Sequence, residues 1–380
     1  MPKLRSVNLL SALACSHATT VGFIHKLTAR DLVGRREASD WRAVSLQLVK
    51  VTVAALVVAA AFPKPSRADE GGTSFWLPGQ FANLAAVPGE PGWSLATVYY
   101  HGSVGDSGSV AATGEMTAGR FNPTVKLNAN ATERTDIVFL SPTYTFATRL
   151  LGGQLAVGVT GVFGRNAVRL DDARTASQGS ISDSLVGIGD LYPIATMRWN
   201  AGANNFMTYL TGDIPVGAYD PNRLAIIGFG HGAIDGGAGY TYFDTKTGHE
   251  FSAVAGLTYN FKNPETQYRN GLDFHIDWAA SQFLSKQVFV GLVGYYYNQL
   301  TNDSGALPIF DGFKSRVTAV GPQIGYLFPI EKMQGYLSLR SYAEFDAANR
   351  PSGWNTWLTF SISPAEPVTV AAPTRRMVTK

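Results

Sequence analysis

Polar and apolar residues alternate along most of the chain after residue 92. In segment 271–281 one face is apolar, and its residues are Leu272, Phe274, Ile276, Trp278 and Ala280. Segments 250–261, 334–346 and 354–362 repeat the pattern, and no long apolar stripe at helical spacing is visible. A period of two residues is typical of a β-strand whose two faces meet different surroundings. We therefore expect an all-β fold.

Weaker runs of the same kind bring the number of expected strands to twelve. They cover residues 93–101, 136–148, 154–164, 188–200, 205–216, 237–244, 250–261, 271–283, 288–299, 315–328, 334–346 and 354–362. Pro142, Pro193, Pro215 and Pro322 fall within or at the ends of these segments. Each proline removes one donor from a strand ladder, so the boundaries near them are the least secure part of the assignment.

The connections between these segments alternate between long and short. The long ones are 102–135, 165–187, 217–236, 262–270 and 300–314, and the short ones are 149–153, 201–204, 245–249, 284–287 and 329–333. The connection 347–353 should be long by this rule and is only moderate. An even strand number, ten-residue alternation and loops sorted by length are typical of a bacterial outer-membrane barrel. We expect a transmembrane antiparallel β-barrel with short periplasmic turns and longer extracellular loops.

The alternative is a soluble β-sandwich, which also alternates but has no reason to sort its loops by length. A closed barrel satisfies every backbone donor and acceptor in lipid. Several aromatic residues fall near strand ends, where the interfacial girdles of such barrels lie: Trp93, Tyr99, Tyr144, Trp199, Phe206, Trp278 and Trp354. No apolar run of about 18 residues follows residue 68, which excludes helical membrane spans there.

The formal charge of +3 belongs to the front end of the chain. Residues 1–68 hold ten of the 31 Lys and Arg residues and three of the 28 Asp and Glu residues. Residues 69–380 therefore carry 21 basic and 25 acidic residues, a net charge of −4. A basic surface for nucleic acid loses its support. The single cysteine, Cys15, also lies in this front end, which excludes disulfides, cysteine zinc sites and cysteine nucleophiles downstream.

The front end resembles an export signal. Residues 51–62 are an apolar run that follows Lys50 and precedes Ser66-Arg67-Ala68. Basic residues, a short apolar core and small residues at the cleavage position are the pattern of a secretory signal, so we expect cleavage after Ala68. Residues 1–42 are long for such a signal, and translation starting near Val44 would explain them. We expect an extension plus signal peptide over 1–68, a segment over 69–92, a barrel over 93–362 and a tail over 363–380.

If the apolar faces meet lipid, the opposite faces line the barrel interior. The candidate residues of a solute path there are Asp190, Arg198, Asp213, Asp273, His275, Asp277, Arg340 and Glu344. One interpretation is a conduit whose charged residues select or position a solute. The other is a set of polar contacts that make a narrow barrel rigid. Twelve strands lie between filled eight-stranded barrels and open channels of 16 to 18 strands, so strand number does not size the pore.

Asp273, His275 and Asp277 lie on one face of one strand, which raises the question of a metal site or of general-base chemistry. Same-face neighbours on a strand are about 6.5–7 Å apart, so one ion could hardly be held by all three residues. We expect a polar network and no metal or cofactor. His231 and His249 are each isolated from a nucleophile motif, so an outer-membrane hydrolase has little support and no enzyme activity is expected.

Residues 69–92 precede the first strand and are rich in Gly and Pro. The segment also contains Phe75, Trp76, Leu77, Phe81 and Leu84, which are too apolar for a disordered lead-in exposed to water. We expect it to be ordered inside the lumen or at the periplasmic mouth, with Phe75, Trp76 and Phe81 as an apolar gate.

Several motifs resemble the meta-pathway phenol-degradation (MetA-type) outer-membrane protein family. They are GGTSFWLPGQFANLAAVPGEPGW (71–93), DIVFLSPTYTF (136–146), GGQLAVGV (152–159), GIGDLYP (187–193) and GLDFHIDW with the following Tyr-rich strand (271–300). The resemblance implies an outer-membrane barrel encoded beside a degradation pathway, admitting aromatic or other hydrophobic compounds. The tail ending in Lys380 departs from the terminal aromatic that the barrel-assembly machinery usually recognises, and Phe360 is the internal substitute we expect.

We expect a channel in the bacterial outer membrane for facilitated diffusion of small hydrophobic or aromatic compounds. Its partners would be outer-membrane lipid, the solute and, during biogenesis, the assembly machinery. The alternative is a structural or surface-interaction barrel without transport activity, whose long loops bind other surfaces. Solute flux separates the two, because only the first predicts it.

Overall fold

The computed structural model describes residues 74–105, 110–117, 120–172, 180–305 and 314–365. Within 120–172 it describes the side chains of residues 132–169 only. The expected signal region 1–68, the cleavage after Ala68 and most of the expected tail lie outside the described residues. No helix within these ranges is long and apolar enough to span a membrane.

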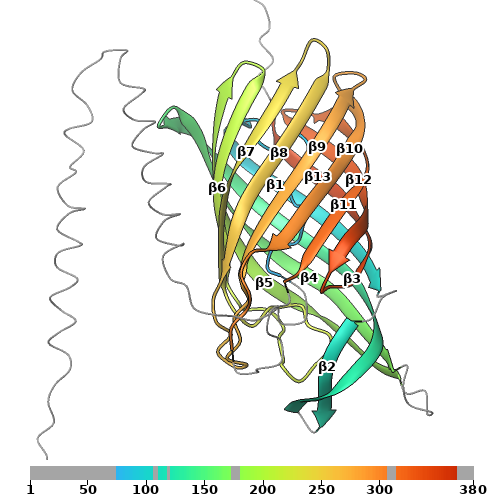
Figure 1. Cartoon of the computed structure of the whole chain (residues 1–380). Coiled ribbons are helices and arrows are strands. Elements are labelled where there is room, and N and C mark those ends of the chain that lie inside the picture. Colours follow the sequence, from blue (N-terminus) through green and yellow to red (C-terminus); the bar gives the residue numbers. More distant parts are fainter. Residues whose placement is uncertain (1–73, 106–109, 118–119, 173–179, 306–313, 366–380) are drawn as a thin grey trace, which may run out of the picture. The chain divides into compact units, whose positions relative to one another are not determined.

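Strands account for nearly all of the described regular structure. They are β1 (Gly92–Gly105), β2 (Val110–Thr117), β3 (Arg120–Leu150), β4 (Gly153–Asp172), β5 (Ser180–Ala201), β6 (Asn204–Asp213), β7 (Ala233–Asp244), β8 (His249–Asn260), β9 (Leu272–Phe283), β10 (Val288–Gln299), β11 (Arg316–Ile330), β12 (Met333–Ala348) and β13 (Ser352–Pro364). From β2 to β13 each strand pairs antiparallel with the next. β1 pairs with both β13 and β3, which closes a twelve-stranded barrel and leaves β2 outside the ring (Figure 1).

This architecture confirms the predicted antiparallel barrel. All twelve expected segments coincide with β1 and β3–β13. Outward side chains are apolar and exposed, as at Ile188 and Leu210, with 64% and 59% exposure. The inward residues Asp277 and Arg340 are buried. Such an apolar outer band around a polar interior is the pattern that lipid imposes, and it places the chain in the bacterial outer membrane.

Two of the expected long loops are strands instead. The β1–β3 ladder continues past Gly102↔Thr135 to Gly105↔Thr132, and the β3–β4 ladder continues to Ala129↔Asp172. The prediction that 102–135 and 165–187 are loops was therefore wrong. Beyond the apolar band neither face of the sheet meets lipid, so these extensions need not alternate in polarity and carry a weaker sequence signal.

The prolines lie where a strand is paired on one side only. Pro142 pairs with Leu95, but the β3–β4 register has no pair at that residue. Pro322 pairs with Leu292 and has no counterpart in the β11–β12 register. The ladder between β5 and β6 likewise begins after Pro193. The backbone N–H that each proline lacks would therefore have had no partner in the neighbouring strand.

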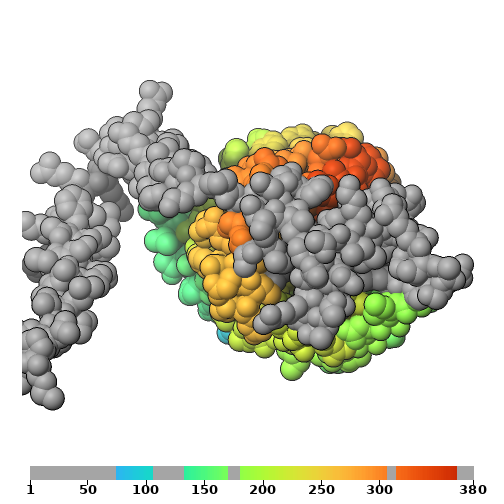
Figure 2. Space-filling view, turned by 60° about the horizontal axis from the view of Figure 1, so that its bottom comes forward, coloured from blue at the N-terminus to red at the C-terminus, as the bar shows by residue number. Residues whose placement is uncertain are grey.

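The short connections lie together at one end of the barrel. The long ones lie at the other end, together with the short connection 349–351 between β12 and β13. Leu151 and Gly152, between β3 and β4, both have positive φ, as in the type I′ turns favoured in two-residue hairpins. Short turns mark the periplasmic end of such barrels. β2 and the long connections lie at the opposite, lower end in Figure 1. Figure 2 looks toward this loop end, where green, yellow and orange-to-red parts of the chain form the rim.

Candidate functional site

The residues before β1 run along the inside of the barrel. We call residues 74–91 the lumen segment. It begins near the loop end, where Ser74 Oγ donates to Asp273 Oδ2 at 3.2 Å, and passes Glu250 close to the periplasmic turns. It then joins β1 at Gly92 (Figure 1). The expected segment 69–92 is therefore placed against the interior wall wherever it is described.

The Asp277 carboxylate binds backbone amides in the middle of the lumen segment. The Gly79 amide donates to Asp277 Oδ1 at 2.9 Å, and the Phe81 amide donates to Oδ2 at 3.0 Å. From β12, three strands along the barrel wall from β9, Arg340 Nη1 donates to the Gly79 carbonyl at 3.0 Å. Both charged side chains are buried. Hydrogen bonds to charged groups are the strong ones, so these residues fix the segment at one height in the barrel.

A second pair of charged side chains binds the segment nearer the periplasmic end. The Leu84 amide donates to Glu250 Oε1 at 3.0 Å, and Arg198 Nε donates to the Ala85 carbonyl at 3.1 Å. Backbone groups in a lumen need partners as much as any buried groups do. The charged lining of this barrel supplies several of them from its wall.

The three proposed gate residues pack against aromatic side chains of the wall. The Trp76 ring stacks on His275, with centroids 3.7 Å apart and planes 13° apart. The ring centroids of Phe81 and Tyr209 are 5.2 Å apart. Those of Phe75 and Tyr192 are 5.5 Å apart. All three belong to one apolar cluster that also includes Met207 and Tyr209, and Phe75 in addition lines a cavity.

Asp273, His275 and Asp277 each have their own partner. Asp273 meets Ser74 and also accepts from Asn260 Nδ2 at 2.9 Å. His275 Nε2 lies 2.9 Å from Asp235 Oδ2, and Asp277 binds the lumen segment. Within the described ranges no group of three His, Cys, Asp or Glu residues is arranged to hold a metal ion. The alternate spacing distributes the three side chains among different contacts, which is the geometry of a polar network.

The remaining predicted lumen residues lie away from these contacts. Asp190 accepts from the Gly217 amide at 2.6 Å and the Phe229 amide at 2.7 Å. Glu344 accepts from Tyr295 OH at 2.7 Å. Asp213 is buried, and neither of its carboxylate oxygens meets a hydrogen-bond partner within the described part of the chain. The predicted set thus divides into residues that hold the lumen segment, residues that shape a cavity and one isolated acid.

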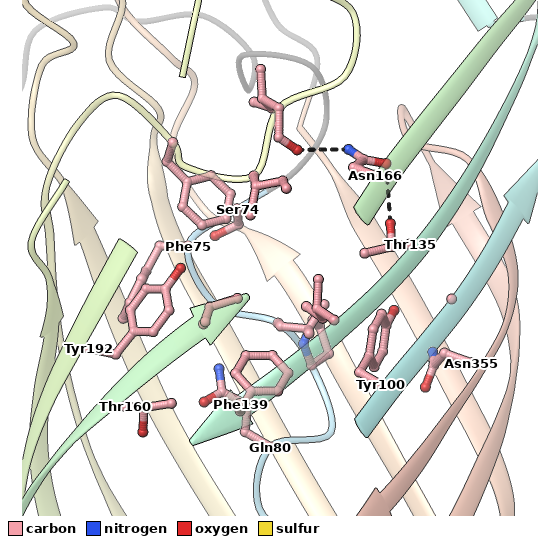
Figure 3. Close-up of a pocket in the computed structure, with 18 of the residues that line it drawn as sticks. Ser74, Phe75, Gln80, Tyr100, Thr135, Phe139, Thr160, Asn166, Tyr192 and Asn355 are labelled. Carbon is pink, nitrogen blue, oxygen red and sulfur yellow. Dashed lines mark hydrogen bonds between the residues drawn. The ribbon is translucent and has the colours of Figure 1, made fainter. Parts of the chain in front are cut away.

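A cavity of about 200 Å³ lies between the lumen segment and the wall formed by β1 and β3–β5 (Figure 3). Tyr192 and Phe75 face it from one side, and Tyr100 and Asn355 face it from the other. Its apolar lining residues are Phe75, Leu77, Pro78, Val104, Ile137, Phe139, Val162, Ile194, Ile226, Ile227 and Phe229. This is the size and character of a pocket for one small, mainly apolar molecule.

One end of the cavity is polar. Two carboxylates, Glu133 and Glu344, and the guanidinium of Arg350 line it together with Tyr100 and Tyr295. Two acidic side chains and one guanidinium therefore meet at this end of the cavity. Sequence reasoning found Glu344 but missed Glu133 and Arg350, which fell in segments expected to be loops. The alternation from Glu133 through Thr135 and Ile137 to Phe139, all of which line the cavity, was the available signal.

The connection between β6 and β7 covers the cavity from the loop end. We call residues 217–229 the lid segment. Asp190 accepts from both of its ends, and Asn166 Nδ2 donates to the Ile226 carbonyl at 2.9 Å (Figure 3). Ile226 and Phe229 thereby line the cavity.

An ion pair outside the membrane anchors the outer part of the lid segment. Arg223 donates to Asp183 through Nη2 at 2.6 Å and through Nε at 3.1 Å. The Ala225 amide donates to the same carboxylate at 3.1 Å. The Arg223 guanidinium, with this amide, holds the pKa of Asp183 well below its usual range. The pair therefore stays ionised at neutral pH.

Comparison with known proteins agrees with the barrel fold. Residues 118–360 match the family model described as "Putative MetA-pathway of phenol degradation". Among solved structures, the COG4313 outer membrane channel from Pseudomonas putida F1 is similar with a TM-score of 0.54 and 12% identity, covering 76% of this chain and 99% of that one. The transport unit of the autotransporter AIDA-I from Escherichia coli gives a TM-score of 0.41 and 10% identity, covering 77% and 94%. No curated protein matches the chain significantly.

Proposed function

The chain belongs to the phenol-degradation family whose model it matches, and from this premise we propose that it is a channel for facilitated diffusion of small hydrophobic or aromatic compounds across the outer membrane. The observation that carries the proposal is the cavity beside the lumen segment. An apolar cavity of about 150 Å³ in another protein is large enough to bind benzene. The cavity here, at about 200 Å³, has room for one substituted aromatic ring.

The lining of the cavity suits an aromatic compound that carries a hydroxyl group. Phe75, Phe139 and Tyr192 offer ring surfaces to the apolar part of the solute. At the polar end, the Glu133 and Glu344 carboxylates can accept a hydrogen bond from the hydroxyl. Pockets of this kind combine apolar walls with a few polar groups that fix orientation.

The lumen segment and the lid segment define the route. The lid segment separates the cavity from the loop end, and the lumen segment separates it from the rest of the interior. Solute would enter when the lid segment moves and leave when the lumen segment yields. Diffusion through the barrel then requires binding in the cavity as an intermediate step, with no chemical step and no cofactor.

Ligand binding to the purified protein tests this function. Saturation-transfer NMR with phenol or a cresol should show contact in the native protein. Ile137→Trp, which points a large ring into the cavity, should reduce the signal at least tenfold. Val138→Trp is the matched control, because Val138 is the next residue of β3 and faces outward.

The results separate the two candidate functions. Loss of binding in the inward variant alone supports a channel with this cavity on its route. Equal binding in both variants, or none in the native protein, contradicts the proposal. A structural or surface-interaction barrel predicts no saturable binding in any of the three proteins.

A further inference from the structure

Three arginines gather on the outer face of the barrel, away from the cavity. Arg134 lies on β3, and Arg165 and Arg169 lie on β4. All three are exposed. Their neighbours Glu133 and Asn166 line the cavity inside, and side chains alternate along a strand, so these arginines face outward.

The strand register brings the three arginines together. Arg134 pairs with Ala167, so Arg165 and Arg169 are its diagonal neighbours on β4. Diagonal neighbours are about 7–8 Å apart, which long side chains can bridge, and like charges so placed repel. Arg134 and Arg165, placed in this way, are best stabilised by an anion that binds between their guanidinium groups.

Two other arginines at the loop end of the barrel already have an acidic partner. Arg316 donates to Asp346 at 2.9 Å, and Arg223 is held by Asp183. Arg134 and Arg165 form no ion pair with any carboxylate in the described part of the chain. The nearest candidate, Asp136, lies opposite Arg165 in the register.

Asp136 is already engaged by other residues. Its Oδ1 accepts from Tyr99 OH at 2.6 Å and lies 2.7 Å from His101 Nδ1. It offsets part of the positive charge of the cluster without bonding to either arginine. The outer surface therefore retains a net positive charge around Arg134 and Arg165.

The cluster lies where the apolar band ends on the side of the long connections. Phe163 precedes Arg165 on the same face of β4 and is 56% exposed. Val186, which pairs with Arg165, and Ile188 next on that face of β5 are 63% and 64% exposed. Because the long connections lie at this end, the arginines are at the level of the outer-leaflet head groups.

The surface around the arginines is hollowed. A hollow of about 820 Å³ is lined by Ser103, Arg134, Arg165, Arg169, Ser182 and Trp354, among others. Glu133 and Asp183 also border it, but Glu133 bonds to Thr135 and Asp183 to Arg223. The hollow thus combines guanidinium groups, hydroxyls and one exposed aromatic ring, and it borders the lipid-facing apolar residues.

We propose that this hollow binds a phosphorylated glycolipid of the outer leaflet. Guanidinium groups bind phosphate through paired hydrogen bonds, which suits Arg134 and Arg165. The hydroxyls of Ser103 and Ser182 face the sugar part of the head group. Acyl chains continue over Phe163 and Ile188. The site is separate from the cavity and does not depend on the proposed transport function.

Native mass spectrometry of the purified barrel in detergent tests the site. The probe is diphosphorylated lipid A, compared with the same glycolipid after removal of both phosphates. The unmodified protein should retain one lipid A molecule and bind the dephosphorylated form at least tenfold more weakly. The variant R134Q/R165Q should lose at least tenfold in affinity for lipid A.

Two controls make the result specific. R316Q removes an arginine at the same end that is already paired with Asp346, and its lipid A binding should equal that of the unmodified protein. Inorganic phosphate at millimolar concentration should not displace the lipid. Heat-modifiable migration in gels, a property of folded barrels, verifies that each variant is assembled.

Several outcomes would overturn the proposal. These are unchanged lipid A binding in assembled R134Q/R165Q, an equal loss in R316Q, or equal binding of the dephosphorylated glycolipid. Displacement by inorganic phosphate would also contradict it, because it would identify a simple anion site.

Discussion

At the scale of single residues, the interior charges of this barrel act mainly on backbone groups. Asp277 accepts from two amides of the lumen segment, and Glu250 accepts from a third. A hydrogen bond to a charged group contributes about 1.5–3 kcal/mol. The carboxylates therefore hold an irregular segment in place where a row of apolar side chains could not satisfy its amides.

Neutralising Asp277 should loosen the lumen segment. In Asp277→Ala, the Gly79 and Phe81 amides lose their acceptor, so we expect faster hydrogen exchange at both and a higher ion conductance in planar bilayers, by roughly threefold or more. Asp244→Ala, in a periplasmic turn, is the control and should leave both unchanged. Unaltered exchange at Gly79 and unaltered conductance would show that Asp277 does not restrain the segment.

The polar end of the cavity should discriminate by charge. Glu133 and Glu344 outnumber Arg350 there, so an aromatic carboxylate should bind more weakly than the corresponding neutral phenol. Glu133→Gln should reduce the ratio of phenol affinity to carboxylate affinity by roughly tenfold, which corresponds to about 1.4 kcal/mol. Competition binding of benzoate against phenol measures it, and an unchanged ratio would exclude a selective role for Glu133.

At the scale of elements, the lid segment is held by side chains and backbone groups of the barrel wall and of the next loop. Asp190 binds both of its ends, Asn166 binds its middle, and the Asp183–Arg223 pair anchors its outer part. The first two hold the lid segment by its backbone and leave its side chains free to contact solute. Its movement is therefore limited by a few identifiable bonds.

The lid segment should undock from the barrel wall when the pH falls into the acid range. The pKa of Asp183 is lowered from its usual 3.8 in the docked state, so docking is fully supported above that value. As the pH falls below about 4, protonation of Asp183 favours the undocked state. The protection factor of the Ala225 amide, taken relative to the intrinsic exchange rate at each pH, should fall there.

Asp183→Asn provides the comparison for this pH effect. Because its side chain does not titrate, the Ala225 amide of the variant should be less protected at neutral pH and should lose no further protection near pH 3. An identical pH profile in both proteins would mean that the pair does not anchor the lid segment.

The sequence specified these elements unevenly, for physical reasons. Strands that cross lipid have one apolar and one polar face, so alternation located all twelve. The extensions of β3–β5 lie beyond lipid and lack that constraint. The lumen segment bonds to residues far away in sequence, such as Gly79 to Arg340, and no local pattern encodes such a pairing. The apolar residues of the lumen segment predicted that it is buried. They did not predict its path through the barrel or the cavity beside it.

At the scale of the whole molecule, closure of the barrel is independent of its contents. β1 pairs with β13 along one edge and with β3 along the other, and the lumen segment forms none of these ladders. The fold therefore separates two tasks. The strands span the membrane, and the lumen and lid segments shape the cavity inside.

Removal of the lumen segment should open the barrel without unfolding it. A chain lacking residues 74–91 should still show heat-modifiable migration, because every strand keeps its neighbours. Its ion conductance should rise well above that of Asp277→Ala. Failure to assemble would show instead that the lumen segment is part of the folding core.

Uptake of a hydroxylated aromatic compound by intact cells tests the central claim most directly. Cells that produce the native protein should take up micromolar radiolabelled phenol or cresol faster than cells without it. Ile137→Trp should return the initial rate to background, and Val138→Trp should preserve it. An uptake rate unaffected by the protein, or unaffected by filling the cavity, would contradict a channel that works through this site.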